Sequence, residues 1–348
     1  MRRGFSLIEL MFAVAIGLFV VGALYALFNG QLKSLVYQDL QAEMHQNARM
    51  SLDILSRTLR NGGLGTSSTT VGVFGAGGDS DQPLPALIHY NNTGPNGSDA
   101  LTVVSMEPAL VISTWGDSPP ACGTTALEFS ASVARNTARL PQYRANDLVM
   151  CYDYASIGGF RSWLWRVTAD GDATTGQLSV ASNTGYADFS SDCDATENLP
   201  LISVCSRAEV ATFYIDADDT DGIGPGSSAH PVLMMDLDFD SPSANDVPIV
   251  DNVEDLQVSW CLDDGDPTTD VSCDTAWQTT LNAAQVSLVY MARITVVARS
   301  SREDLRDLYP GTRPAVEDNL ASATSDHYLR TVLSTDVTVR NLRIQGLL

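Results

Sequence analysis

The chain of 348 residues contains a single lysine, Lys33, and has few basic residues of any kind. Lys and Arg together number 20 against 42 Asp and Glu, which gives a formal net charge of -22. Nucleic-acid binding depends on basic contacts to phosphates, so binding through the bulk surface is disfavoured. Four arginines lie close together in the sequence (Arg293, Arg299, Arg302 and Arg306), and a solvated face with local ion pairs is favoured over a basic binding patch.

The sequence also lacks the short motifs of common enzyme and metal sites. It has no C-x-x-C, H-E-x-x-H or G-x-S-x-G motif and no Walker glycine–lysine loop. The four histidines are far apart: His45, His89, His230 and His327. A catalytic triad is defined by geometry and stays open, but the prediction is a protein that is not an enzyme.

Between Phe5 and Phe28 there is no proline and only one charged residue, Glu9. A helix of this length spans roughly 36 Å, enough to cross a hydrocarbon core of about 30 Å. Arg2 and Arg3 precede it, so the positive-inside rule places the N-terminus in the cytoplasm and the bulk of the chain outside. A secretory signal peptide would have a shorter apolar core, of about 7–15 residues, followed by a small-residue cleavage site that is missing here.

Glu9 distinguishes this segment from a plain membrane anchor. An ionisable residue in a spanning helix costs about 2.5–3.5 kcal/mol at the centre and less near the interface. Such a residue indicates a function and needs a partner. An interfacial carboxylate that reaches water is the alternative interpretation.

The residues from Gly4 to Leu10, GFSLIEL, resemble the N-terminal signal of type IV prepilins and pseudopilins. The resemblance implies that a prepilin peptidase cuts between Gly4 and Phe5, and that Phe5 is then N-methylated. It also implies that Glu9 is the carboxylate used in filament assembly. Cleavage frees an ammonium group at Phe5, and pairing of Glu9 with that group of a neighbouring subunit would offset the cost of a buried carboxylate in one axial register only.

Length and two later stretches are similar to the large minor pilins of the PilW type. The stretches are Asn252–Val258 (NVEDLQV) and Leu333–Asn341 (LSTDVTVRN). The resemblance implies a minor pilin that primes or supports filament assembly, at low copy number or at the tip. Its partners would be other major and minor pilins, the prepilin peptidase, the inner-membrane assembly platform and membrane lipid. The protein would first lie in the inner membrane with its bulk in the periplasm, and then in the pilus at the cell surface.

The helix is predicted to continue beyond the apolar run, because apolar residues recur every three or four positions. This stripe consists of Leu32, Val36, Leu40, Met44, Ala48, Leu52, Leu55 and Leu59. Asn61-Gly62-Gly63 is a typical C-terminal stop.

After residue 98, short β-like runs alternate with turn signals, which indicates antiparallel sheet rather than βαβ units. The runs are 100–105, 147–152, 162–168, 177–181, 210–215, 232–237, 256–261, 287–297 and 328–344, and a short helix is expected over 301–308. The predicted fold class is α+β and pilin-like, a long N-terminal helix plus an antiparallel β-rich domain. Its parts are a leader (1–4), the helix (5–61, with 5–28 transmembrane and 29–61 amphipathic), an irregular linker (62–98) and the β-rich domain (99–348).

Six cysteines lie in the part expected outside the cytoplasm: Cys122, Cys151, Cys193, Cys205, Cys261 and Cys273. An even number there indicates disulfides. Proximity in sequence favours Cys193–Cys205 and Cys261–Cys273 and leaves Cys122–Cys151. Six cysteines allow fifteen pairings, and buried free thiols are the alternative.

An acidic loop, with Asp216, Asp218, Asp219 and Asp221 before Gly222, partly matches a calcium-binding loop. Counted back from Gly222, the first ligand position is Ala217 and the distal position is Ser228, so the pattern fails at both ends. A solvated turn is favoured, and no cofactor is expected.

Two other functions remain open at this point. One is a pseudopilin of type II secretion, which the length of the chain disfavours. The other is a surface receptor or adhesin that keeps its anchor uncut. The sequence does not reveal which subunits neighbour this one, any ligand, or whether the pili serve motility, DNA uptake or adhesion.

Overall fold

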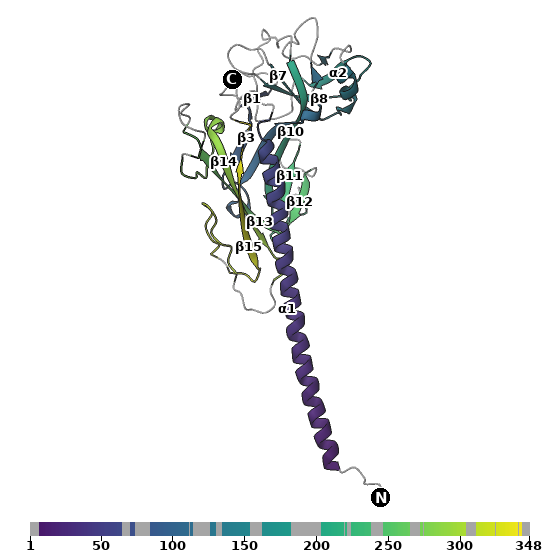
Figure 1. Ribbon diagram of the computed structural model, residues 1–348, viewed down its shortest axis with the longest axis vertical. Coiled ribbons are helices and arrows are strands. Elements are labelled where there is room, and N and C mark those ends of the chain that lie inside the picture. Colours follow the sequence, from purple (N-terminus) through teal and green to yellow (C-terminus); the bar gives the residue numbers. More distant parts are fainter. Residues whose placement is uncertain are drawn as a thin grey trace.

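A long helix projects from one end of a β-rich body in the computed structural model (Figure 1). The structure describes these residues: 7–64, 70–73, 84–110, 112–113, 126–129, 134–153, 162–181, 203–218, 220, 224–237, 246–264, 272–273, 275–303, 311–323, 325–339 and 341–342. The architecture is α+β with mostly antiparallel strand pairs, as the sequence predicts.

Helix α1 (Leu7–Asn61) contains no proline and ends where the sequence predicts. Gly63 has a φ of +77°, a left-handed conformation that glycine adopts without a steric penalty. The predicted apolar stripe divides into two parts. Leu40 and the later stripe residues are buried against the body, whereas Leu32 and Val36 are exposed because α1 meets the body only from about residue 37 onward.

The larger sheet has the path β12–β11–β10–β7–β8–β1–β2 within the described residues, with β3, β4, β5, β6 and β9 attached beside it. Its strands are β1 (Thr70–Val73), β2 (Leu84–Pro85), β3 (Leu87–Tyr90), β4 (Ala100–Met106), β5 (Ile112–Ser113), β6 (Ala126–Glu128), β7 (Leu148–Asp153), β8 (Ser162–Val167), β9 (Gln177–Ala181), β10 (Ser203–Asp216), β11 (Val232–Asp236) and β12 (Val247–Asp251). Only β1 and β8 pair in parallel among the described pairs.

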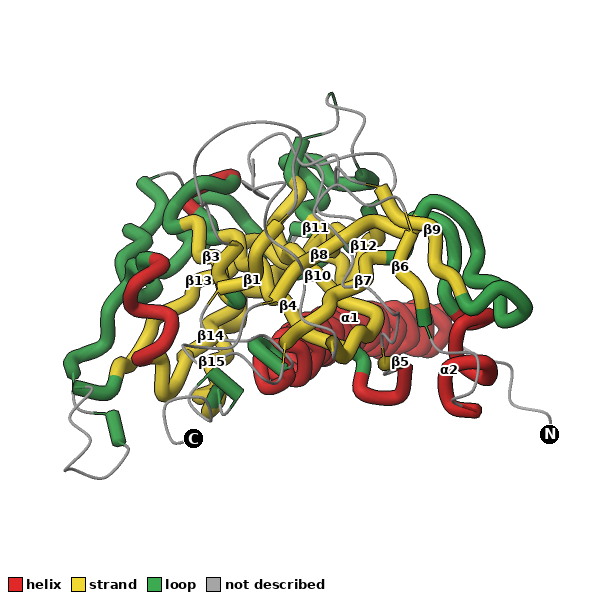
Figure 2. The backbone as a smooth tube through the Cα atoms, turned by 90° about the horizontal axis from the view of Figure 1, so that it is seen from above, coloured by secondary structure: helices red, strands yellow, loops and turns green. Residues whose placement is uncertain are grey.

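The smaller sheet has the order β13–β14–β15 and lies against α1. Its strands are β13 (Val253–Leu262), β14 (Val289–Arg299) and β15 (Arg330–Thr338). Short helices complete the described elements: α2 (Ala134–Arg139), η1 (Pro95–Gly97), η2 (Pro108–Leu110), η3 (Leu140–Gln142) and η4 (Ala283–Leu288). Figure 2 shows the strands as a curved layer along one side of α1.

One hydrophobic core joins α1 to both sheets. Leu55 and Leu59 of α1 pack with Val258 and Ile294 of the smaller sheet and with Phe213 of β10, and all five are at most 1% exposed. Burying such a side chain contributes about 1.5–3 kcal/mol, so this core fixes the C-terminal (upper) half of α1, from Leu40 onward, to the body.

A second core lies between β7, β8, β9 and β10, around Trp165 and Tyr143. It contains the disulfide Cys151–Cys205, which joins directly opposed residues of β7 and β10. This bond corrects the predicted pairings Cys193–Cys205 and Cys122–Cys151, because strand pairing brings together two cysteines 54 residues apart. The predicted Cys261–Cys273 disulfide is confirmed. Cys122 and Cys193 lie outside the described residues.

Each predicted β-like run overlaps an observed strand. The structure differs from the expectation over 62–98, where it contains β1, β2, β3 and η1 rather than an irregular linker. Ala86 and Leu87 in this stretch are buried in the main core. Glycine and polar turn residues are frequent in this stretch and its apolar runs are short, so the sequence shows no strand periodicity there. Of the expected helix over 301–308, residues 304–308 lie outside the described residues.

Candidate functional site

The projecting half of α1 is the most unusual surface of the protein. Its most apolar 18-residue window has a mean hydropathy of 2.5, and none of it is buried against the body. This excludes the core helix of a soluble protein, which would be covered by its own fold. Residues 7–28 alone extend roughly 33 Å, enough to cross a bilayer core of about 30 Å.

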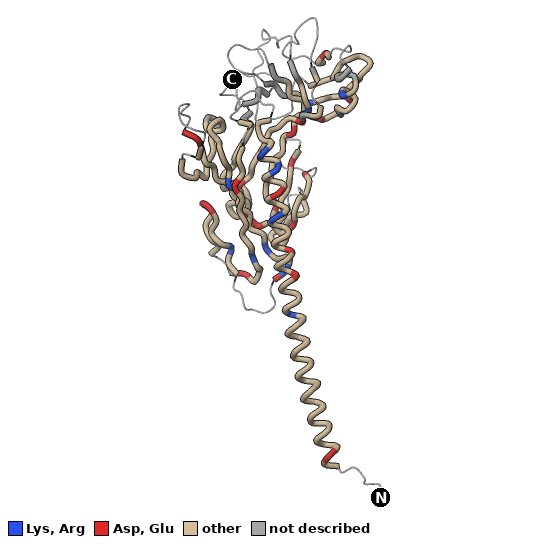
Figure 3. Tube along the Cα trace, in the orientation of Figure 1, with Lys and Arg blue, Asp and Glu red and all other residues tan. Residues whose placement is uncertain are grey.

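Glu9 lies in the first turn of this helix and is exposed. A carboxylate there is favoured by the partial positive charge at a helix N-terminus. Figure 3 shows no further charged residue along the projecting half until Lys33. Gly4 and Phe5, the predicted cleavage and methylation residues, lie outside the described residues.

A short neck, residues 29–39, separates the apolar half from the first residue buried against the body, Leu40. Leu32, Leu35 and Val36 are 60%, 62% and 43% exposed and lie at i, i+3 and i+4, on one side of the helix. A bilayer core covering residues 7–28 does not reach them.

Polar contacts fix the upper half of α1 on the body. Glu43 accepts hydrogen bonds from Ser301 Oγ (2.9 Å) and Asn252 Nδ2 (3.4 Å), and Asn47 Nδ2 donates to the carbonyl of Asp251 (2.9 Å). Together with the core, these bonds fix the direction in which the projecting half leaves the body.

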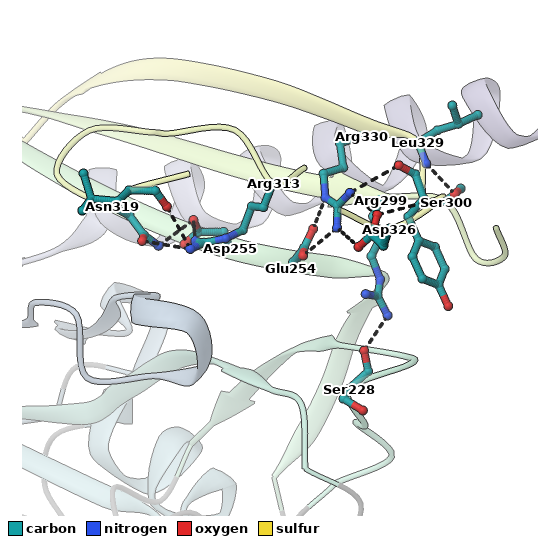
Figure 4. A network of polar contacts seen from close by, with 12 residues as sticks. Ser228, Glu254, Asp255, Arg299, Ser300, Arg313, Asn319, Asp326, Leu329 and Arg330 are labelled. Atoms are coloured by element: carbon teal, nitrogen blue, oxygen red, sulfur yellow. Dashed lines mark hydrogen bonds and ion pairs between the residues drawn. The ribbon is translucent and has the colours of Figure 1, made fainter. Parts of the chain in front are cut away.

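Two buried ionic networks lie on the face of β13–β14–β15 that points away from α1 (Figure 4). In the first, the Asp255 carboxylate accepts from Arg313 Nη1 (2.7 Å), Asn319 Nδ2 (2.8 Å) and Gln257 Nε2 (2.9 Å). Burial raises the pKa of Asp255 to about 6, although Gln257 and Arg313 act in the opposite direction. Asn319 also donates to the carbonyl of Gly97, so this network joins three segments distant in sequence.

In the second network, Arg330 makes a two-bond contact with Glu254, Nε to Oε2 (2.6 Å) and Nη2 to Oε1 (3.0 Å). Its guanidinium also donates to Asp326 (2.6 Å). Burial alone lowers the pKa of Arg330, but the hydrogen bonds to Asp326 and Glu254 outweigh it, so the pKa is raised and the charged form is favoured. Burial alone would raise the pKa of Asp326, but the hydrogen bonds from Arg330 outweigh burial and hold the pKa of Asp326 below its usual range.

The arginine run therefore makes local contacts rather than a basic patch. Arg293 pairs with Asp336 (2.8 Å), and Arg299 donates to the Ser228 carbonyl (2.8 Å) and lies over the Tyr328 ring. Arg302 is exposed, and Arg306 lies outside the described residues. Neither network is predicted by the sequence, although the NVEDLQV stretch contains Glu254, Asp255 and Gln257.

A buried chain of hydrogen bonds, Trp260–His89–Asp99, superficially resembles part of a catalytic triad. Trp260 Nε1 donates to His89 Nδ1 (3.1 Å), so His89 Nε2 carries the proton and donates to Asp99 Oδ2 (3.0 Å). Asp99 also accepts from the Val258 amide (2.8 Å). The His89 and Asp99 side chains are 0% and 1% exposed, so the arrangement is structural and has no access to a substrate.

In the acidic loop, the Asp216 carboxylate accepts from the amides of Asp218 (3.1 Å) and Gly226 (2.8 Å). Asp218 accepts from both the amide and the hydroxyl of Thr220. These carboxylates organise turns, and no cluster suited to a metal ion occurs within the described part of the chain. Asp219 and Asp221 lie outside it.

Comparisons with known families match both ends of the chain. A sequence model of the type IV pilus-assembly protein W family matches residues 212–341, and a model of the prokaryotic N-terminal methylation motif matches residues 1–25. Both later stretches that resemble PilW lie inside the first match, so the resemblance to PilW-type prepilins is confirmed.

Among solved structures, the chain is similar to the type IV-like pilin TTHA1219 from Thermus thermophilus, at 11% identity and a TM-score of 0.36. That match covers 86% of this chain and 98% of the other. No curated protein sequence matches the chain.

Proposed function

We propose that this chain, which matches prepilin-type families at both ends, is a minor pilin of a type IV pilus and has a structural, non-enzymatic role. The observation that carries the proposal is the uncovered apolar half of α1, whose first turn contains Glu9, four residues after Phe5. Such a surface supports a single-pass membrane anchor and, after cleavage, packing among the helices of neighbouring pilins.

Processing precedes assembly in this proposal. A prepilin peptidase at the cytoplasmic face cuts after Gly4, and Phe5 is N-methylated. The bulk of the chain stands in the periplasm until the inner-membrane platform adds it to a filament. The test is mass spectrometry of the N-terminal peptide from native cells. A chain that begins at N-methylated Phe5 supports the proposal, and a chain that begins at Met1 favours an uncut anchor or receptor.

Glu9 then selects the axial position of the subunit. Its carboxylate pairs with the N-terminal ammonium group of a neighbour, which offsets the cost of burying either charge alone. Glu9→Gln keeps the shape and removes the charge, and we expect it to abolish entry into filaments while leaving membrane insertion intact. Asp39→Asn, which removes an exposed carboxylate from the neck of the same helix, is the matched control. Normal assembly of Glu9→Gln would refute the register role.

The β-rich body supports a low-copy or tip position, where the subunit primes assembly. The body is far wider than α1, and repeating it along a shaft would crowd neighbouring subunits (Figure 1). Gold labelling of a tagged chain on sheared pili tests this. Labels at filament ends support the proposal, and abundant labels along the shaft contradict it.

A further inference from the structure

Strand β15 forms one edge of the smaller sheet, and its outer side is not paired within the described residues. The direction of its backbone groups follows from two hydrogen bonds that flank the β14–β15 ladder: Ser300 N to Leu329 O (2.9 Å) and Val339 N to Tyr290 O (3.1 Å). In an antiparallel pair the bonding direction alternates along the strand. The odd-numbered residues of β15 therefore bond β14, and the N–H and C=O groups of Val332, Ser334 and Asp336 point outward.

Two other sheet edges of the described part, β13 and β12, are protected. On β13, the Asp99 amide donates to the Leu256 carbonyl (2.8 Å) and Gln278 exchanges two hydrogen bonds with Trp260 (2.7 and 2.8 Å). On β12, Pro248 removes a donor, and the β11–β12 register shifts between Leu233 and Met234. Proline, bulges and covering segments are the usual means by which proteins prevent pairing at sheet edges.

Among the described residues, edge β15 carries none of these devices. Its nine residues, RTVLSTDVT, contain no proline or lysine, and five are β-branched. Its pairing with β14 runs without a register shift. Its one acidic side chain, Asp336, is held by Arg293 (2.8 Å) rather than directed against an approaching strand. Val332 is 41% exposed, and Ser334 and Asp336 are exposed as well.

We propose that β15 is a docking edge that accepts an extended strand from a different protein of the same assembly. Outward N–H and C=O groups would supply the main-chain hydrogen bonds, and an apolar side chain of the added strand would cover Val332. This proposal deepens the proposed function by naming the surface that a partner would bind. It rests on the proposed function in one respect, that all subunits have the same orientation in the membrane.

Two observations argue against a second copy of this chain as the occupant. Leu329 packs on Leu40 and Met44, and Asn341 donates to the Arg60 carbonyl, so β15 runs alongside α1 and in the same direction. Antiparallel pairing of two β15 strands would therefore point the two apolar helices in opposite directions, which one membrane does not permit. In addition, each copy carries a net charge of -22. We infer a partner strand from a less acidic chain.

The experiment places a photo-cross-linking amino acid at position 332 or 334 of the full chain in native cells, with Gln142, exposed on η3, as the control position. The cross-linked peptides are then sequenced. A docked strand gives cross-links from 332 and 334 that fall about two residues apart in one segment of a different protein. Scattered cross-links, cross-links to a second copy, or equal labelling from position 142 would overturn the proposal.

A proline variant provides the second arm. Ser334→Pro removes an outward N–H that β14 does not use, so the fold should survive, whereas Thr335→Pro removes a donor to β14 and should destabilise the sheet. With Ser334→Pro we expect the cross-link yield from position 332 to fall about tenfold relative to Ser334→Ala, as for the loss of one or two hydrogen bonds. An unchanged yield in a folded Ser334→Pro protein would refute strand addition. The cross-linking result does not depend on whether the chain begins at Phe5. Failure of the pilin proposal is therefore detected separately, by mass spectrometry of the N-terminal peptide.

Discussion

Arg330→Met is the sharpest test of what holds the smaller sheet together. Arg330 and Glu254 have side chains 7% and 9% exposed and are joined by two hydrogen bonds. Methionine has a similar length and fills much of the space, so the main effect is to leave the Glu254 carboxylate buried without its counter-charge. Removing one partner of a buried ion pair costs about 3–5 kcal/mol.

The matched control is Arg293→Met, on the neighbouring strand of the same face. Arg293 pairs with Asp336, but these side chains are 33% and 40% exposed, and exposed pairs contribute about 0–1 kcal/mol. The double variant Arg330→Met/Glu254→Leu removes both buried charges and should recover most of the lost stability, because the carboxylate that still loses Arg330, Asp326, is 34% exposed and can be hydrated.

The assay is equilibrium unfolding in urea of the full chain in detergent, followed by tryptophan fluorescence, to which the fully buried Trp260 contributes. The expected order of stability is wild type, then Arg293→Met close to it, then the double variant, then Arg330→Met. Equal effects of Arg330→Met and Arg293→Met, or a double variant no more stable than Arg330→Met, would refute the reasoning.

Three further predictions follow from the same structure. Burial raises the pKa of Asp255 from 3.8 to about 6, so the protonated carboxyl is favoured in the folded state. The free energy of unfolding should therefore be highest below pH 4 and fall by about 3 kcal/mol as the pH rises through 6. Urea titrations at several pH values measure this dependence, and Asp255→Asn should flatten it. Loss of the Cys151–Cys205 disulfide, which closes a separation of 54 residues, should cost about 4 kcal/mol, and non-reducing peptide mapping should recover the two cysteines in one linked species; a Cys193–Cys205 species would contradict the structure. Leu55→Ala, in the core under α1, should cost about 2–5 kcal/mol in the same assay, whereas Leu35→Ala, on the exposed neck, should leave unfolding unchanged and act only on assembly.

The elements that the sequence predicts well are those specified by nearby residues. The apolar run, its single glutamate and the GFSLIEL signal lie within a few turns of one helix, so their physical consequences need no tertiary contact. The end of α1 is equally local, because Gly63 alone supplies the left-handed conformation. The β-like runs were located for the same reason, since alternation and turn residues act over a few positions.

The elements that sequence analysis missed depend on contacts between distant residues. Proximity in sequence favoured Cys193–Cys205, but strand pairing opposes Cys151 to Cys205. In the sequence the NVEDLQV stretch shows only a resemblance to PilW, yet its two carboxylates bind Arg313 and Arg330, which lie 58 and 76 residues further on.

The sequence by itself determined that residues 7–28 lie in a helix long and apolar enough for a bilayer, next to a motif that resembles a prepilin signal, because hydropathy, charge and a short motif act locally. Only the tertiary structure decided where the apolar stripe on α1 stops being buried, which cysteines and charges meet, and which sheet edge is unpaired among the described residues. These features depend on how strands far apart in the chain are placed side by side, and the free energy of that placement comes from burial summed over the whole body rather than from any one segment.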